Sequence, residues 1–186
     1  MVLSLVTLLL SASDDFAVVR RERDGLVLAK RPAAQSEFEE LRVEGDTDAS
    51  PESLSDIIWN DRARSDVKTY LAHRQIVQVE AQKRIERQLV DAPIIGKRDS
   101  LVRFERHTEA DGTIVISWTL GGKPENAKAE TMKLQRGAWR LTPKPGGGTR
   151  VEFRTIADPG GVPALFAISP QRDVALSIVR AVLEAS

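Results

Sequence analysis

The sequence contains no cysteine and only two histidines. Without cysteine the chain forms no disulfide and offers no thiolate as a metal ligand or nucleophile, and the redox compartment stays open. The histidines, His73 and His107, have no second ligand at a spacing typical of metal sites. No G-x-S-x-G nucleophile elbow and no phosphate-binding loop occur either. The sequence therefore predicts no metal site, no cofactor and no enzymatic activity.

The chain also lacks an excess of charge of either sign, since 27 basic residues balance 27 acidic ones. Nucleic-acid binding draws its affinity from a basic surface that faces phosphates, and no basic run longer than a pair occurs. We therefore expect no nucleic-acid partner. A length of 186 residues suits one domain with a sizeable core, which we expect to be a monomer.

Long hydrophobic runs are missing too, except at the N-terminus, where residues 2–10 are apolar apart from Ser4 and Thr7. This run is too short to span a bilayer, and the small residues after it are typical of a signal-peptide cleavage site. The usual positive segment before such a run is absent, because the first basic residue is Arg20. Residues 1–13 are therefore either a signal peptide, which would export the protein to the periplasm, or a hydrophobic tail on a cytoplasmic protein.

What the sequence does contain is a series of strand-like segments separated by turn signals. The Asp24-Gly25 pair is typical of a hairpin turn, and Asp111-Gly112 marks a second turn. A short helix is expected at 51–59, because Ser50 can cap it and Pro51 suits its first position. Strands are expected at 16–21, 26–30, 38–44, 73–80, 83–90, 101–107, 113–120, 131–136, 139–141 and 150–156.

A long amphipathic helix is expected near the C-terminus. Apolar residues recur there every three to four positions from Val174 to Leu183, after an apolar segment that begins at Ala164. The Ser169-Pro170 pair predicts a kink or a restart of this helix. Since the apolar face of the helix must be covered and a sheet is available, the sequence predicts an α+β fold. In that fold a curved antiparallel sheet wraps around the C-terminal helix.

Several of the strand segments alternate charged and apolar side chains. Arg103 and Glu105 share one face of their strand, and we expect that face to be the solvated outer side of the sheet. Two interpretations of the inner side stay open: its side chains pack into a filled core, or they surround an elongated apolar cavity for a hydrophobic ligand. The inner side chains are Val102, Phe104, Ile114, Ile116, Trp118, Met132, Leu134, Trp139, Leu141, Val151 and Phe153.

Four local motifs follow one another along the chain: IIWNDRARSDVKTY with Trp59, APIIGKRDSLV with Arg98 and Asp99, RGAWRLTPKPGGGTRVEFRT, and ADPGGVPALF with Asp158, Gly161 and Pro163. In this order they resemble the START (steroidogenic-acute-regulatory-related lipid transfer) domains of the helix-grip superfamily, in a bacterial-type single-domain form. The resemblance covers residues 16–186. It implies a helix-grip fold that holds one lipid or sterol-like molecule in a tunnel, with the C-terminal helix and the 91–98 loop as its lid.

The resemblance also implies where the ligand lies. Some family members place an acidic and a basic residue inside the tunnel, but Phe104 stands at the basic position here. We therefore expect an apolar floor, or a polar group supplied by a residue such as Ser100 or Ser117. Ile94 and Ile95 are expected to close the lid or to dip into a membrane during loading. The expected ligand-binding residues are Val102, Phe104, Ile116, Trp118, Trp139, Phe153, Leu165 and Phe166.

Two other functions stay open beside the one we expect, which is non-covalent binding, transfer or sensing of one hydrophobic molecule with transient membrane contact. Relatives within the superfamily resemble cyclases or aromatases that act on polyketide-like substrates. Such an enzyme would need an acid–base side chain in the cavity, for which Arg98, Asp99 and Tyr70 are the candidates. An interaction protein with a filled core would have no tunnel.

Overall fold

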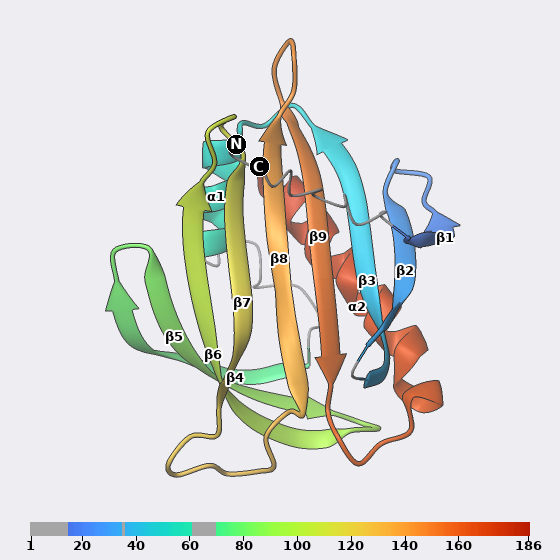
Figure 1. Ribbon diagram of the computed structural model, residues 1–186, viewed down its shortest axis with the longest axis vertical. Coiled ribbons are helices and arrows are strands. Elements are labelled where there is room, and N and C mark those ends of the chain that lie inside the picture. The colour runs from blue at the N-terminus through green and yellow to red at the C-terminus, as the bar shows by residue number, and fades with distance from the viewer. Residues whose placement is uncertain (1–14, 35, 61–69) are drawn as a thin grey trace, which may run out of the picture.

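In the computed structural model, the described residues form one antiparallel sheet of nine strands that curves around two helices (Figure 1). The structure describes residues 15–34, 36–60 and 70–186. The predicted α+β helix-grip fold is confirmed. The elements are β1 (Ala17–Arg21), β2 (Val27–Ala33), β3 (Ser36–Thr47), α1 (Pro51–Trp59), β4 (Leu71–Glu80), β5 (Lys83–Ala92), β6 (Gly96–Thr108), β7 (Ile114–Gly122), β8 (Leu134–Pro143), β9 (Thr149–Asp158) and α2 (Ala164–Glu184).

The strand order across the sheet is β1-β2-β3-β9-β8-β7-β6-β5-β4, so β1 and β4 are its edges and the sheet is not closed. Segments 131–136 and 139–141, expected as two strands, contribute to the single strand β8, and Gly137 lies inside it. A Cβ atom at Gly137 would overlap the Trp118 ring and the carbonyl oxygen of Arg154. Glycine is therefore required here because a neighbouring ring and a neighbouring backbone both approach closely.

Both predicted helices are present. The hydroxyl of Ser50 accepts a hydrogen bond from Ser53 N at 3.2 Å, so the predicted cap of α1 is confirmed. α2 runs without interruption through Pro170, and the alternative of a restart at that residue is wrong. The proline removes the N–H that would bond to the Phe166 carbonyl. Burial of Ala167 and Ala175 on either side keeps the helix against the sheet.

The main core lies between the concave face of the sheet and the two helices. α1 contacts β7 and β8, while α2 contacts β3, β9 and α1. Each fully buried Leu or Val side chain stabilises the fold by roughly 1.5–3 kcal/mol. A second, smaller cluster surrounds the start of α2 and consists of Phe38, Ile156, Ala164 and Ala167. The fully buried members of the main core include Leu28, Val43, Leu54, Val102, Ile116, Leu141, Val151, Leu176 and Val179.

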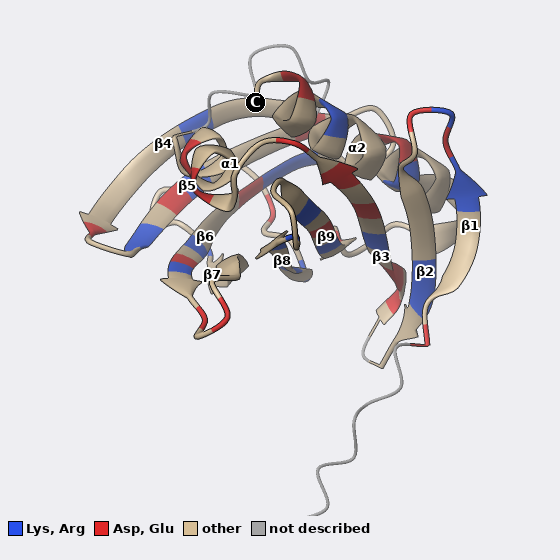
Figure 2. Ribbon diagram, turned by 90° about the horizontal axis from the view of Figure 1, so that it is seen from above, with Lys and Arg blue, Asp and Glu red and all other residues tan. Residues whose placement is uncertain are grey.

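Charged residues form bands along the strands (Figure 2). Arg103 and Glu105 are exposed, so the prediction that they face solvent is confirmed. Ion pairs such as Lys83 Nζ to Glu105 Oε1, at 3.3 Å, link neighbours on this outer side. Solvent-exposed pairs of this kind contribute little each. The stability of the fold therefore comes mainly from the concave side.

Two features of the sequence lie outside the described residues. They are the hydrophobic N-terminal segment 1–13 and Asp61, the acidic residue that follows Trp59 and Asn60 in the first family-like motif. Neither α1 nor α2, the helices of the described part, is both long enough and apolar enough to cross a membrane.

Candidate ligand-binding cavity

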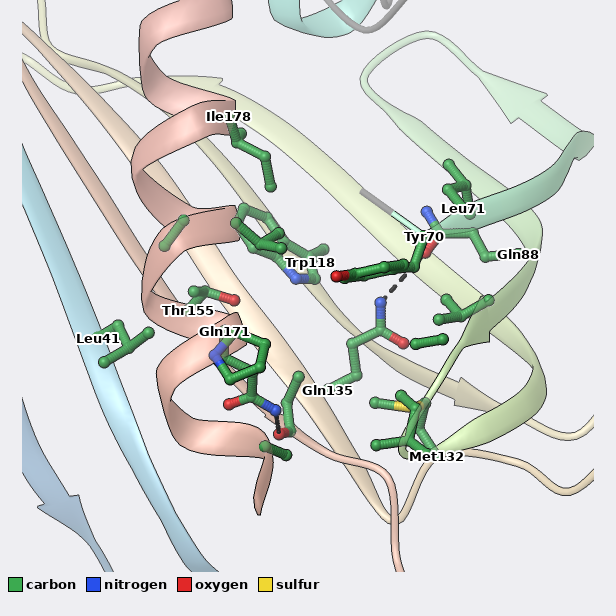
Figure 3. A pocket seen from close by; sticks show the side chains of 18 of the residues that line it. Leu41, Tyr70, Leu71, Gln88, Trp118, Met132, Gln135, Thr155, Gln171 and Ile178 are labelled. Atoms are coloured by element: carbon green, nitrogen blue, oxygen red, sulfur yellow. Dashed lines mark hydrogen bonds between the residues drawn. The ribbon is translucent and has the colours of Figure 1, made fainter. Parts of the chain in front are cut away.

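A cavity of about 270 Å³ lies between the concave face of the sheet and α2 (Figure 3). This volume is just below the range of roughly 300–1,000 Å³ that is usual for small-molecule sites. The lining is mostly apolar, and in the described residues it includes no Asp, Glu, Lys, Arg or His. The interpretation of a completely filled core is therefore wrong.

Four aromatic side chains form the floor of the cavity. Phe104 on β6 lies opposite Trp118 on β7, and Trp139 on β8 lies opposite Phe153 on β9. Gly137 lies opposite Trp118 and leaves room for its ring to reach Phe153, at a centroid distance of 5.6 Å. The centroids are 6.1 Å apart for Phe104 and Trp118 and 4.6 Å apart for Trp139 and Phe153. The sequence predicts all four as ligand-binding residues, and all four line the cavity.

α2 forms the roof of the cavity. Its lining residues are spaced three or four positions apart or directly adjacent, which places them on one face of the helix. Most of them are small or apolar, so the roof leaves space above the aromatic floor. They are Ala167, Pro170, Gln171, Val174, Ala175 and Ile178.

The turn between β5 and β6 borders the cavity. The two strands continue further than expected, so the expected 91–98 loop is reduced to a turn of Pro93, Ile94 and Ile95. All three residues line the cavity. Ile95 also packs against the small cluster at the start of α2, whereas Ile94 is 51% exposed. The turn thus contacts both the cavity and the helix, while its movement as a lid stays a prediction.

Four of the predicted ligand-binding residues lie elsewhere. Val102 and Ile116 are buried in the main core, where side chains of α1 and α2 cover this part of the concave face. Leu165 and Phe166 are 84% and 58% exposed, because Ala167 takes the sheet-facing position in that helical turn. The structure therefore does not place Leu165 and Phe166 over the cavity; they project into solvent.

Apart from Tyr70, polar groups reach the lining from positions that the sequence reasoning missed. Neither Ser100 nor Ser117 lines the cavity. The Ser100 hydroxyl instead accepts a hydrogen bond from Met132 N at 3.2 Å, which ties β6 to the segment before β8. Apart from the tryptophan indoles, the polar lining side chains are those of Tyr70, Gln88, Gln135, Thr155 and Gln171.

Gln88 and Gln135 form an amide pair in the wall of the cavity. β7 ends at Gly122, and the segment around Glu130 takes its place beside β6, where Asp99 N donates to Glu130 O at 2.8 Å. This arrangement brings the start of β8 close to β5. Gln135 Nε2 donates to Gln88 Oε1 at 3.1 Å (Figure 3).

Behind the amide pair lies an ion cluster centred on Glu86, whose side chain is fully buried. Gln88 Nε2 donates to Glu86 Oε2 at 2.9 Å, and Arg74 donates to the carboxylate through two nitrogens. Arg84 Nε lies 2.7 Å from Glu86 Oε1. Burial acts to raise the pKa of the Glu86 carboxyl, but the hydrogen bond from Arg74 and the charges of Arg84 and Arg74 outweigh it. The pKa therefore lies below its ordinary value, and Glu86 is a carboxylate at neutral pH.

Arg84 connects this cluster to the aromatic floor and to α1. Its guanidinium carbon lies 4.5 Å from the Trp59 ring centroid and 4.9 Å from that of Phe104, and it donates to the Trp59 carbonyl. Arg84 is the partner of Phe104 in the β5–β6 ladder, so a basic residue lies next to position 104 but outside the cavity lining. The period-two set Arg84, Glu86 and Gln88 could have signalled an inward polar face. The assumption that charged strand residues face solvent misses this polar face.

Arg98 and Asp99 lie outside the cavity lining. Arg98 donates to the carbonyls of Pro159 and Gly160, at 2.7 and 2.9 Å, and so ties β6 to the connection between β9 and α2. Asp99 is held by Arg87. Of the three candidate acid–base residues, Tyr70 is the one that lines the cavity.

The Asp158 motif forms the start of α2. Asp158 accepts hydrogen bonds from Gly160 N and from the Ser36 hydroxyl, each at 2.8 Å. Gly161 has a φ of 69°, and Pro163 is the N-cap residue of the helix. No group of three side chains able to hold a metal ion occurs among the residues that the structure describes.

Comparison with known proteins supports the fold. No protein-family model and no curated protein sequence matches the chain. Solved structures do: a STAR-related lipid transfer protein from Xanthomonas axonopodis superposes with a TM-score of 0.77 at 18% identity, covering 92% of this chain and 98% of that one. Human StAR-related lipid transfer protein 5 gives 0.79 at 17% identity, covering 94% and 88%. The Zhui aromatase/cyclase from Streptomyces sp. R1128 gives 0.52 at 16% identity, covering 78% and 92%. The chain has the fold of the START domains.

Proposed function

We propose that the chain binds one lipid-like hydrophobic molecule non-covalently in the cavity, and carries or senses it. The observation that carries this proposal is the apolar lining beneath α2, which in the described residues includes no charged side chain. The fold, which the chain shares with lipid transfer proteins from a bacterium and from human, supports it.

Apolar burial would supply most of the affinity. Each 200 Å² of apolar ligand surface removed from water contributes roughly 5 kcal/mol, at about 25 cal/mol per Å². The lost freedom of the ligand offsets part of this gain. A cavity of about 270 Å³ favours a ligand with one chain or one compact ring system.

Ligand exchange would take place beside the β5–β6 turn. Ile94, Leu165 and Phe166 are exposed apolar residues there, and we call them the mouth patch. Ile95 packs against the cluster that contains Ala164, so the turn and the start of α2 lie next to each other. Transient contact between the mouth patch and a membrane would bury these side chains and give the lipid a dry path to the cavity.

A cyclase- or aromatase-like reaction is the alternative, and the likeness to the Zhui aromatase/cyclase favours it. Such chemistry needs a group that gives or takes a proton at the substrate. Among the described lining residues, Tyr70 is the one with a titratable side chain. An enzyme of this kind would release a ligand of changed covalent structure, with a changed mass where the reaction expels water, whereas a carrier returns the ligand unchanged.

The test combines native mass spectrometry of the protein as expressed with titration by a fluorescent long-chain alcohol. Val174→Trp would fill the cavity from α2, and Leu165→Trp is the matched control because it places the same side chain on the exposed face. We expect the wild-type protein and the control to hold one ligand per chain. Val174→Trp should bind the probe at least roughly tenfold more weakly, since the lost apolar burial exceeds 1.4 kcal/mol. Equal binding by both variants, or no binding by the wild-type protein, would overturn the proposal.

A further inference from the structure

The orientation of the two glutamine amides in the cavity wall is fixed by Glu86, which lies behind them. A carboxylate only accepts hydrogen bonds, so the Gln88 amide nitrogen must face Glu86. Gln88 Oε1 then faces Gln135, whose amide nitrogen must donate to it. The hydrogen-bond chain that starts at Glu86 therefore ends in the amide oxygen of Gln135.

This oxygen is an acceptor without a donor in the described part of the chain. Gln135 forms one side-chain hydrogen bond there, through its nitrogen, and its side chain lines the cavity. Figure 3 shows the Gln135 side chain projecting from β8 into the cavity, with the amide nitrogen directed along the dashed bond. If a bound ligand displaces water from this oxygen and offers it no donor, the unsatisfied acceptor makes the free energy of binding less favourable. A ligand that brings its own donor avoids this cost.

We propose that Gln135 accepts a hydrogen bond from a hydroxyl group of the ligand, and that Glu86 and Gln88 are positioning residues that hold Gln135 in its accepting orientation. The inference rests on the proposed function and names its ligand class: an uncharged amphiphile with a hydrocarbon body and a hydroxyl end. An ether or ester oxygen would face the amide oxygen with lone pairs on both sides. A carboxylate would enter a lining whose described residues contain no cation to pair with it.

The test uses three probes of equal chain length, 1-dodecanol, its methyl ether and dodecanoate at pH 8, titrated against the full chain by calorimetry. We expect the alcohol to bind the wild-type protein roughly tenfold more tightly than the ether, the ratio that one net hydrogen bond provides. Dodecanoate should bind more weakly than the alcohol. Gln135→Met keeps the length of the side chain and removes the acceptor, so the alcohol-to-ether ratio should fall close to one. Gln75→Met is the matched control, because it makes the same change at an exposed position on β4 outside the cavity lining, and its ratio should stay at the wild-type value.

The positioning role has a readout of its own. Gln88→Met removes the amide that orients Gln135, which can then turn its N–H groups toward the ligand. The affinity for the methyl ether should therefore rise, while that for the alcohol, whose hydroxyl can accept as well as donate, should change little. A purely structural loss would weaken both probes together and would overturn this role. Wild-type protein that binds all three probes equally sinks the hydroxyl inference and leaves the proposed function standing, whereas wild-type protein that binds none of them sinks both.

Discussion

Asp99 accepts two hydrogen bonds from Arg87 across the β5–β6 ladder, at 3.0 and 2.6 Å. The partner directly opposite Asp99 is Leu89, so the ion pair runs diagonally across the two strands. Lys128 N donates a third hydrogen bond to Asp99 at 2.7 Å, from the segment between β7 and β8. One carboxylate thereby fixes that segment beside β6, near the point where Gln135 reaches Gln88.

Replacing this carboxylate should therefore destabilise the fold in a pH-dependent way. The hydrogen bond from Arg87 lowers the pKa of the Asp99 carboxyl, and the hydrogen bond from Lys128 N and the charge of Arg87 add to this effect against burial. A carboxyl whose pKa is lowered on folding contributes stability that is complete above its unfolded-state value, about 3.9. That contribution is lost as the pH falls through the lower folded-state value.

We expect Asp99→Asn to lower the melting temperature by several degrees at pH 7. Urea unfolding of both proteins between pH 7 and pH 3 checks the sign. The difference in free energy of unfolding should stay constant down to about pH 4 and shrink below it. A difference that grows as the pH falls would show that Asp99 is not stabilised as a carboxylate.

Gly137→Ala should destabilise the aromatic floor. The added Cβ would overlap the Trp118 ring and the carbonyl oxygen of Arg154, and backbone cannot give way as a flexible side chain can. We expect a loss of about 3 kcal/mol in the free energy of unfolding. The control is Gly25→Ala in the β1–β2 turn, where a Cβ meets no atom within 4 Å and φ is 87°. Backbone strain alone should lower the free energy of unfolding of this control by about 1 kcal/mol. Equal losses in the two variants would contradict the steric argument.

The fold was predictable because its signals are local. Each signal depends on residues that are close together in the sequence: the alternation along the strands, the cap at Ser50 and the turn pair Asp24-Gly25. The four floor aromatics were predictable for the same reason, since each strand's period-two pattern decides which of its side chains point inward. Pro170 shows the limit of such signals, because the packing of α2 against the sheet overrides a local break.

The polar end of the cavity was not predictable, because it depends on pairing between distant strands. Nothing near Gln135 in the sequence indicates that it meets Gln88, on a strand that is not its neighbour in the sheet. The burial of Glu86 is a related case. A charged residue in an alternating strand is usually solvated. Glu86 can be buried because Arg84, on its own strand, and Arg74, on the adjacent strand β4, pair with its carboxylate.

Pro170→Ala should stabilise the roof of the cavity. The substitution restores the N–H that bonds to the Phe166 carbonyl and removes the steric penalty of the proline ring inside α2. We expect the free energy of unfolding to rise by about 1–3 kcal/mol, measured by urea unfolding. Because Pro170 lines the cavity, a stiffer roof should also slow the release of a bound fluorescent alcohol. Unchanged stability would show that the helix has already adapted to the proline.

The mouth patch should govern the rate of lipid exchange with membranes and not the affinity for ligand in solution. Leu165 and Phe166 project into solvent beside the β5–β6 turn and do not line the cavity. Substituting them therefore leaves the aromatic floor unchanged, so the two roles can be tested separately. Leu165→Asp combined with Phe166→Asp would place two charges where the proposed membrane contact forms, and removing charge from water is costly.

We expect this double variant to extract a fluorescent lipid from neutral phosphatidylcholine vesicles at least roughly tenfold more slowly than the wild-type protein. Its affinity for a soluble probe should remain unchanged. Val77→Asp combined with Val79→Asp is the matched control, since both are exposed apolar residues on the edge strand β4, and its extraction rate should equal that of the wild-type protein. Equal slowing by the control would assign the effect to net charge. Normal extraction by the double variant would place the membrane contact elsewhere on the surface.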